Sequence, residues 1–147
     1  HGVPRPLSGT IDVGLKYTYG GYDGSKVKTT EEGLSSRTHY EVVQSHNGLS
    51  RMVLRLDTGR THQIRVHLQH IGCPIVGDVR YGDEAKDAEL LARPGARRRL
   101  YLHAWRISFP HPITRHAVKV TAPEPEEFAA LMDGAQGNAG VERKRGG

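Results

Sequence analysis

The residues most suited to chemistry lie close together at positions 58–67, which read TGRTHQIRVH. A strand pattern ends just before them, the chain turns at Gly59, and a helical pattern begins. Backbone N–H groups at the start of a helix lack intrahelical partners, so they favour a phosphate or a carboxylate. The segment therefore predicts an anion-binding site at a strand-to-helix turn.

Within this segment, Arg65 is the side chain best suited to hold an anion. It follows His62 by three residues, so the two share a helix face, whereas Ile64 and Leu68 occupy a different, buried face. A planar guanidinium anchored in this way can grip a carboxylate or a phosphate with two hydrogen bonds. Charged helix faces are more often only solvated, and the residue types alone leave both interpretations open.

Two strands must hold the start of this helix. Alternating side chains predict one strand at 38–43 and a second at 51–56. Between them, Asn47-Gly48 is a strong hairpin-turn signal. The sheet is therefore expected to be at least partly antiparallel, in an α+β arrangement of strands and helices.

The helix is expected to run from Thr61, as its N-cap, to Ile71. Gly72 supplies a natural C-terminal stop, and Pro74 prevents continuation. The other predicted elements are strands at 9–15, 100–104, 106–109 and 117–121, helices at 83–91 and from Pro125 to Leu131, and loops at 17–24 and 31–36.

The composition suits one globular domain. The chain has 147 residues, of which 36% are hydrophobic and 25% charged, enough to bury a real core. No apolar stretch approaches the ~18 residues that a membrane-spanning helix needs. Cys73 is the single cysteine, which excludes an internal disulfide and favours a reducing, cytoplasmic location. The formal net charge of +5 permits a polyanionic partner. We expect residues 1–132 to form the domain and 133–147 a disordered basic tail.

Several motifs, taken in order, resemble the RluA family of pseudouridine synthases. Residues 58–67 match the family pattern TGRTHQIRVH, and 72–82 follow its GHPIxGDxxYG pattern apart from Cys73. The similarity continues in LHA at 102–104, FPHP at 109–112 and AP at 122–123, and the strand at 38–43 resembles the family's TxYxVV. The agreement covers roughly residues 37–128 and is greatest with the branch that acts on large-subunit ribosomal RNA.

The resemblance implies both a fold and a reaction. The fold is the pseudouridine synthase catalytic domain, an α/β (α+β) arrangement with a mixed, mostly antiparallel sheet flanked by helices. The reaction isomerises uridine to pseudouridine in RNA, with large-subunit ribosomal RNA as the expected substrate. The family uses a catalytic aspartate, takes no cofactor or metal, and flips the target nucleotide into a cleft.

Two family features are missing from the sequence. The catalytic aspartate of the family lies in an HRLDxxTSG motif upstream of TGRTHQIR, and no such motif occurs here. The active-site tyrosine of the family is also absent, and Asp57 and Asp78 do not match the catalytic position. We therefore expect the chain to be the C-terminal part of the catalytic domain, incomplete at its N-terminus. Its site would be completed by a missing N-terminal half, and the chain alone is expected to be inactive.

The resemblance also assigns site residues. Arg65 matches the arginine that pairs with the catalytic aspartate and keeps it ionised, so here it is expected to be the partner of an absent aspartate or to be solvated. Leu102 is a candidate for packing against the uracil, with an ordinary core leucine as the alternative. The residues expected to contact RNA, lining or bracing the cleft entrance, are Arg60, Thr61, His62 and Gln63.

Other interpretations remain at this stage. A non-catalytic RNA-binding module could keep the scaffold without the aspartate, and an HRLD-type segment upstream of residue 1 would distinguish the enzyme from it. The spacing of His67, His70 and Cys73 invites a zinc site, but no fourth ligand stands out. The sequence has no G-x-S-x-G motif of a serine hydrolase. The basic triplet at 97–99 is either a solvated turn or a phosphate contact.

Overall fold

The computed structural model of the chain describes residues 1–19 and 25–132, which form an α+β arrangement as predicted. The strands are β1 (Ser8–Asp12), β2 (Leu15–Tyr19), β3 (Ser25–Thr29), β4 (Arg37–His46), β5 (Leu49–Leu56), β6 (Arg106–Pro110) and β7 (Ala117–Thr121). The helices are α1 (Gln63–His70), α2 (Glu84–Leu90) and α3 (Glu126–Leu131). The tail expected at 133–147 lies outside the described residues.

The strand pairings of the described residues are all antiparallel. β1, β4 and β5 form a sheet in the order β1-β4-β5, whereas β2-β3 and β6-β7 each form a separate two-stranded sheet. The β4–β5 hairpin turns at Asn47 and Gly48, whose φ angles of 49° and 74° are the left-handed values that a tight hairpin turn favours. The predicted antiparallel pairing is confirmed, but the strands are divided among three small sheets instead of one mixed sheet.

Three predicted elements differ from the structure. The strand predicted at 9–15 ends at Asp12, and Leu15 already belongs to β2. The sequence predicts a loop at 17–24, but β2 extends to Tyr19 and pairs with β3. Leu15 and Val27 are 2% and 5% exposed, so this hairpin has a buried side despite its polar composition. Residues 100–104 were expected to form a strand, yet within the described chain they pair with no strand. Apolar side chains of that segment pack into the core without a ladder of hydrogen bonds.

Helix α1 is flanked on both sides by a residue with left-handed backbone, His62 before it and Gly72 after it. Its N-cap is His62, with φ 55° and no side-chain capping bond, so the predicted cap at Thr61 is wrong. The Thr61 hydroxyl is instead hydrogen-bonded to the Tyr17 hydroxyl on β2. At the other end Gly72 has φ 77°, and the Cys73 N–H donates to the Leu68 carbonyl. The predicted glycine stop is thus confirmed.

The core holds α1 between the main sheet and the β2–β3 hairpin. Leu68 on α1 packs with Ile11 of β1 and Tyr40 of β4, whereas Val66 packs with Leu15 and Val27 of the hairpin. A further cluster joins β5 to α2 and α3 through Leu49, Val76, Leu90, Leu131 and Met132. Because α1 is packed on two sides, the side chains at its start have fixed positions.

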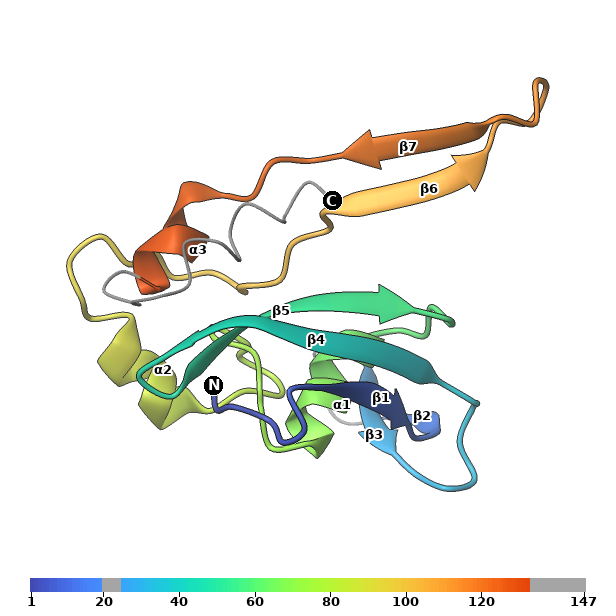
Figure 1. Cartoon of the computed structure of the whole chain (residues 1–147). Helices are drawn as coiled ribbons and strands as arrows, with labels where there is room; N and C mark the ends of the chain where they lie inside the picture. The colour runs from blue at the N-terminus through green and yellow to red at the C-terminus, as the bar shows by residue number, and fades with distance from the viewer. Residues whose placement is uncertain (20–24, 133–147) are drawn as a thin grey trace.

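The β6–β7 hairpin extends away from the rest of the chain, on the opposite side of the β4–β5 sheet from α1 (Figure 1). All five residues of β6 are exposed. The ion pair between Arg51 of β5 and Glu124, just before α3, connects the segment that follows the hairpin to the main sheet. No described helix has the length and apolar character that crossing a membrane requires.

Candidate functional site

The start of α1 carries a buried ion pair between Arg65 and Asp78. The Arg65 Nε donates to Asp78 Oδ2 at 2.8 Å, and Nη2 donates to Oδ1 at 2.7 Å. The Asp78 side chain is 0% exposed and the Arg65 side chain 17% exposed. Two parallel hydrogen bonds of this kind fix the plane of the guanidinium as well as its distance.

Asp78 also shapes the turn in which it lies. Its Oδ1 accepts hydrogen bonds from the backbone N–H groups of Arg80 and Tyr81, both at 3.0 Å. Burial disfavours ionisation of this carboxyl, but the hydrogen bonds from Arg65 and from the two backbone N–H groups outweigh it and lower the pKa of Asp78. The hydrogen bonds with Asp78 in turn raise the pKa of Arg65, against the effect of burial. Both groups are therefore charged at neutral pH.

Tyr81 connects this ion pair to His62. The Arg65 guanidinium carbon lies 5.1 Å from the centre of the Tyr81 ring, within the range of a cation–π contact. The Tyr81 hydroxyl accepts from the Val27 N–H and lies 2.8 Å from the His62 Nδ1. The Tyr81 hydroxyl can donate its own proton to Nδ1 in the His62 tautomer that carries its proton on Nε2. Burial lowers the pKa of His62, and the nearby positive charge of Arg65 lowers it further.

The partner of Arg65 within this chain differs from the expectation. The sequence predicts that its carboxylate partner is absent or that the guanidinium is solvated, and it assigns no role to Asp78. The structure instead shows Arg65 held by Asp78, 13 positions further along. Asp78 does not take the catalytic position of the family, and the pairing of Arg65 with a catalytic aspartate stays a prediction. The only sequence signal for Asp78 was the Gly77-Asp78 pair, which follows the predicted helix stop at Gly72.

Gln63 has a structural role. It is 2% exposed, so its side chain is directed into the fold, and the predicted contact with RNA stays a prediction. Its Oε1 accepts from the Thr58 hydroxyl and from the Arg60 N–H. Its Nε2 donates to the Arg37 carbonyl and to the Thr38 hydroxyl. Gln63 thus holds the turn at the start of α1 from inside the fold.

The other predicted contacts lie in three different settings. Arg60 and Thr61 are exposed at the turn, with Arg60 Nε donating to the Ser35 carbonyl at 3.2 Å. His62 is partly buried next to the Arg65–Asp78 pair. Leu102 packs against the core cluster that contains Ile11 and Tyr40 and also lines the large cleft described below, so both interpretations of this residue stay predictions. The structure therefore brings His62 and Arg65 together and places Leu102 in a different cluster.

His67 is held inside the fold by two hydrogen bonds. Its Nδ1 lies 2.8 Å from the Thr38 hydroxyl and its Nε2 lies 2.9 Å from the Val13 carbonyl. A carbonyl can only accept, so Nε2 carries the proton and Nδ1 accepts from Thr38. Both ring nitrogens are thus engaged, and within residues 1–19 and 25–132 no group of three potential metal ligands is present. The zinc interpretation of His67, His70 and Cys73 has no support in this geometry.

We expect folding stability to fall as the pH drops below about 6.5, the usual pKa of an unfolded histidine. Burial lowers the pKa of His67 in the folded chain, so there only the unfolded state binds the proton. The contribution of His67 to the free energy of unfolding is therefore fully present above this pH. It decreases as the pH falls toward the pKa of His67 in the folded chain, by at most about 1.4 kcal/mol per pH unit. Urea unfolding between pH 5 and 8 should show a smaller pH dependence in His67→Gln than in the wild type. The matched variant His70→Gln, at an exposed position, should keep the wild-type dependence, and an equal change in both variants would contradict the assignment.

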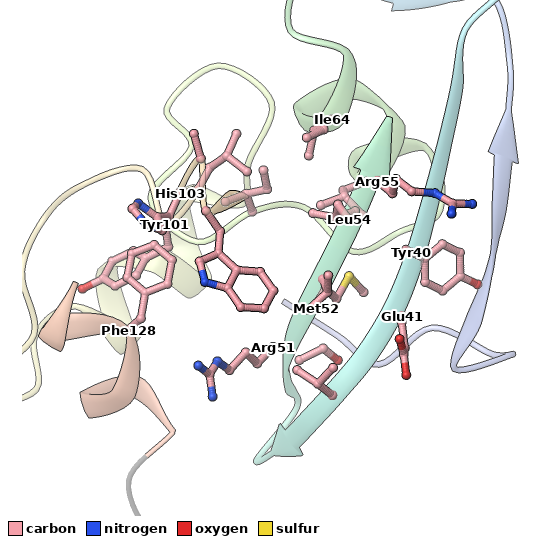
Figure 2. A pocket seen from close by; sticks show the side chains of 18 of the residues that line it. Tyr40, Glu41, Arg51, Met52, Leu54, Arg55, Ile64, Tyr101, His103 and Phe128 are labelled. Carbon is pink, nitrogen blue, oxygen red and sulfur yellow. The ribbon is translucent and has the colours of Figure 1, made fainter. Parts of the chain in front are cut away.

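A large open cleft lies between the main sheet and the segment that leads into β6. Its volume is about 1720 Å³. Figure 2 shows Tyr101, His103 and Phe128 opposite β5, which contributes Met52 and Leu54. Ile64 of α1 reaches this cleft, but Arg65 is not among the residues that line it. The cleft and the Arg65–Asp78 pair are therefore two separate features, connected through α1.

The basic triplet at 97–99 lies next to a smaller recess of about 560 Å³. Arg99 is held in place, with Nη1 donating to Glu127 at 3.0 Å and its guanidinium 5.1 Å from the Phe128 ring centre. Arg97 and Arg98 are exposed. Within the triplet, Arg97 and Arg98 are thus exposed enough to contact a phosphate, whereas Arg99 is held against Glu127 and Phe128.

Comparison with known proteins agrees with the sequence motifs. The family model described as RNA pseudouridylate synthase matches residues 3–70. The chain is 43% identical over 106 residues to ribosomal large subunit pseudouridine synthase C of Haemophilus ducreyi, covering 72% of this chain and 32% of that protein. It is 32% identical over 136 residues to the uncharacterized RNA pseudouridine synthase YjbO of Bacillus subtilis, covering 91% of this chain and 44% of the relative. The chain thus spans less than half the length of these relatives.

A solved structure gives the same result for the fold. Human RNA pseudouridylate synthase domain containing 1 superposes with a TM-score of 0.64 at 26% identity, covering 84% of this chain and 51% of that one. The strands and helices described above thus have the α+β fold of a pseudouridylate synthase domain. The chain belongs to the RluA family of pseudouridine synthases.

Proposed function

We propose that this chain forms the Arg65-bearing part of an enzyme that isomerises uridine to pseudouridine in RNA, with large-subunit ribosomal RNA as the substrate. The observation that carries the proposal is the fixed guanidinium of Arg65 within TGRTHQIR, at the start of a helix packed on two sides. The names of the relatives support the substrate class. The single cysteine, Cys73, is buried and forms no disulfide, and this supports the proposal of a reducing, cytoplasmic setting.

The role proposed for Arg65 is to hold the catalytic aspartate ionised and oriented. A guanidinium has five N–H donors in a fixed fork, and Asp78 takes one donor on Nε and one on Nη2. Among the described residues, Nη1 has no hydrogen-bond partner. The edge formed by Nη1 and the second proton of Nη2 is therefore available to a second carboxylate. This arrangement lets one arginine bind Asp78 and a catalytic aspartate together.

The catalytic aspartate is proposed to come from a polypeptide segment that this chain does not contain, the N-terminal half of the same domain. The sequence holds no HRLDxxTSG motif, and the chain spans less than half of its relatives. The cleft beside β5 supplies a surface for such a segment, because much of its lining is aliphatic or aromatic. On this proposal the 147-residue chain has no activity of its own.

The experiment compares the product of the complete reading frame with this chain alone. Each is incubated with transcribed large-subunit ribosomal RNA, and pseudouridine is measured by nucleoside mass spectrometry. We expect pseudouridine with the complete protein and none with the 147-residue chain. RNA binding by the complete protein without any pseudouridine would refute the proposed function and favour a non-catalytic RNA-binding module.

A further inference from the structure

The Asp78 carboxylate is fully committed to contacts within the chain. It accepts two hydrogen bonds from Arg65 and two from the backbone N–H groups of Arg80 and Tyr81. Its side chain is 0% exposed, so it has no free face for RNA or solvent. Its position is set by the turn that contains it, and the turn is tied to the core by Tyr81, which is 4% exposed.

The pair is buried unequally. The carboxylate is fully buried, whereas the Arg65 side chain keeps 17% of its surface. Asp78 binds the guanidinium along the edge formed by Nε and Nη2, and the Tyr81 ring lies against the same group. These contacts restrain the guanidinium on one edge and on one face. On the opposite edge, Nη1 makes no hydrogen bond with any of the described residues.

From this geometry we infer that Asp78 is a positioning residue for Arg65 in the proposed isomerisation, with Tyr81 as a second support. The inference rests on the proposed function and goes beyond it, because it assigns a role to a carboxylate that touches neither RNA nor the reacting base. Asp78 fixes where the free edge of Arg65 points. A long arginine side chain without this grip would sample several rotamers, and a misplacement of about 1 Å in a catalytic site lowers rates by about 10²-fold.

The first test is steady-state and single-turnover kinetics of Asp78→Asn in the protein from the complete reading frame. We expect kcat to fall about 10²-fold, with the KM for RNA within about threefold of wild type, because RNA affinity is spread over many phosphate contacts. The control is Asp87→Asn on α2, which removes another buried carboxylate, one paired with His1 at 2.6 Å. Asp87→Asn should change the unfolding midpoint without changing kcat.

The second test separates positioning from stability. If Asp78 acts through Arg65, then Asp78→Asn should lower kcat by less than about twofold in an Arg65→Lys background, because lysine cannot present the fork that Asp78 holds. A purely structural role would give the same loss in both backgrounds. Asp78→Glu keeps the charge and should recover part of the kcat lost in Asp78→Asn. If Asp78→Asn does not fold, Asp78→Glu is measured in its place. A wild-type kcat in Asp78→Glu would then contradict the positioning role of Asp78.

The outcomes distinguish the two proposals. If the wild-type protein forms pseudouridine and Asp78→Asn has the same kcat, this inference is overturned but the proposed function is not. Equal losses in the wild-type and Arg65→Lys backgrounds would do the same. Absence of pseudouridine from the wild-type reaction would overturn the proposed function, and this inference with it.

Discussion

Replacing Arg65 by alanine in the complete protein should lower turnover by at least about 10³-fold while leaving most of the RNA affinity. Removal of one preorganised hydrogen-bond donor group from a catalytic site commonly costs 10²–10³-fold in kcat, and Arg65 is proposed to orient the catalytic carboxylate as well. Binding is spread over many phosphate contacts, so it is expected to survive. Pseudouridine formation and RNA binding, measured on the same preparation, test both halves of this prediction.

The ion pair with Asp78 makes a stability control necessary. Removing Arg65 leaves a fully buried carboxylate without its main partner, which costs about 3–5 kcal/mol. Arg65→Lys keeps a positive charge near Asp78, so it should retain more stability than Arg65→Ala while still losing most of the turnover, since an ammonium group cannot bind two carboxylates along two edges. Wild-type turnover in a folded Arg65→Ala protein would show that the assigned role is wrong.

The sequence was most informative where structure is decided locally. The strands around Asn47-Gly48 follow from alternation and from a turn whose residues accept left-handed backbone. The end of α1 follows from Gly72 in the same way. At the hairpin turn and at the helix end, the backbone conformation is determined by residues close together in the sequence, so the sequence pattern predicts it.

The prediction failed where the deciding interaction comes from elsewhere in the chain. The Thr61 hydroxyl is bonded to Tyr17 of β2, which removes it from the predicted cap of α1. Gln63 looks like a surface residue by type, but it is buried because Thr38 and Thr58 supply partners for its amide. Asp78 belongs to the same group, since only the folded turn shows that it meets Arg65. Tertiary hydrogen bonds of this kind leave no periodic signal.

Position 77 requires glycine because the backbone of Arg99 lies very close to it, a tertiary contact that the sequence pattern does not indicate. A Cβ there would lie 1.7 Å from the Arg99 carbonyl oxygen and 2.7 Å from the Arg99 carbonyl carbon, and the backbone has φ 78°. Both neighbours are backbone atoms, so no side-chain rotation relieves the clash. The next residue is Asp78, and the Val76 carbonyl accepts from the Tyr101 N–H. Any shift that makes room must therefore move the turn that holds Arg65 or the segment beside it.

We expect Gly77→Ala to destabilise the fold by more than about 4 kcal/mol, well beyond the 0.5–3 kcal/mol of most substitutions. The matched control is Gly72→Ala, where φ is 77° but no atom lies within 4 Å of the added Cβ. Only the backbone strain applies there, and it costs about 1–2 kcal/mol.

Urea unfolding followed by the fluorescence of the single tryptophan, Trp105, measures both variants. A domain of this size has about 5–15 kcal/mol of stability, so Gly77→Ala should unfold at much lower urea than Gly72→Ala. Equal midpoints for the two variants would show that the close approach of residues 77 and 99 does not constrain the turn that positions Asp78.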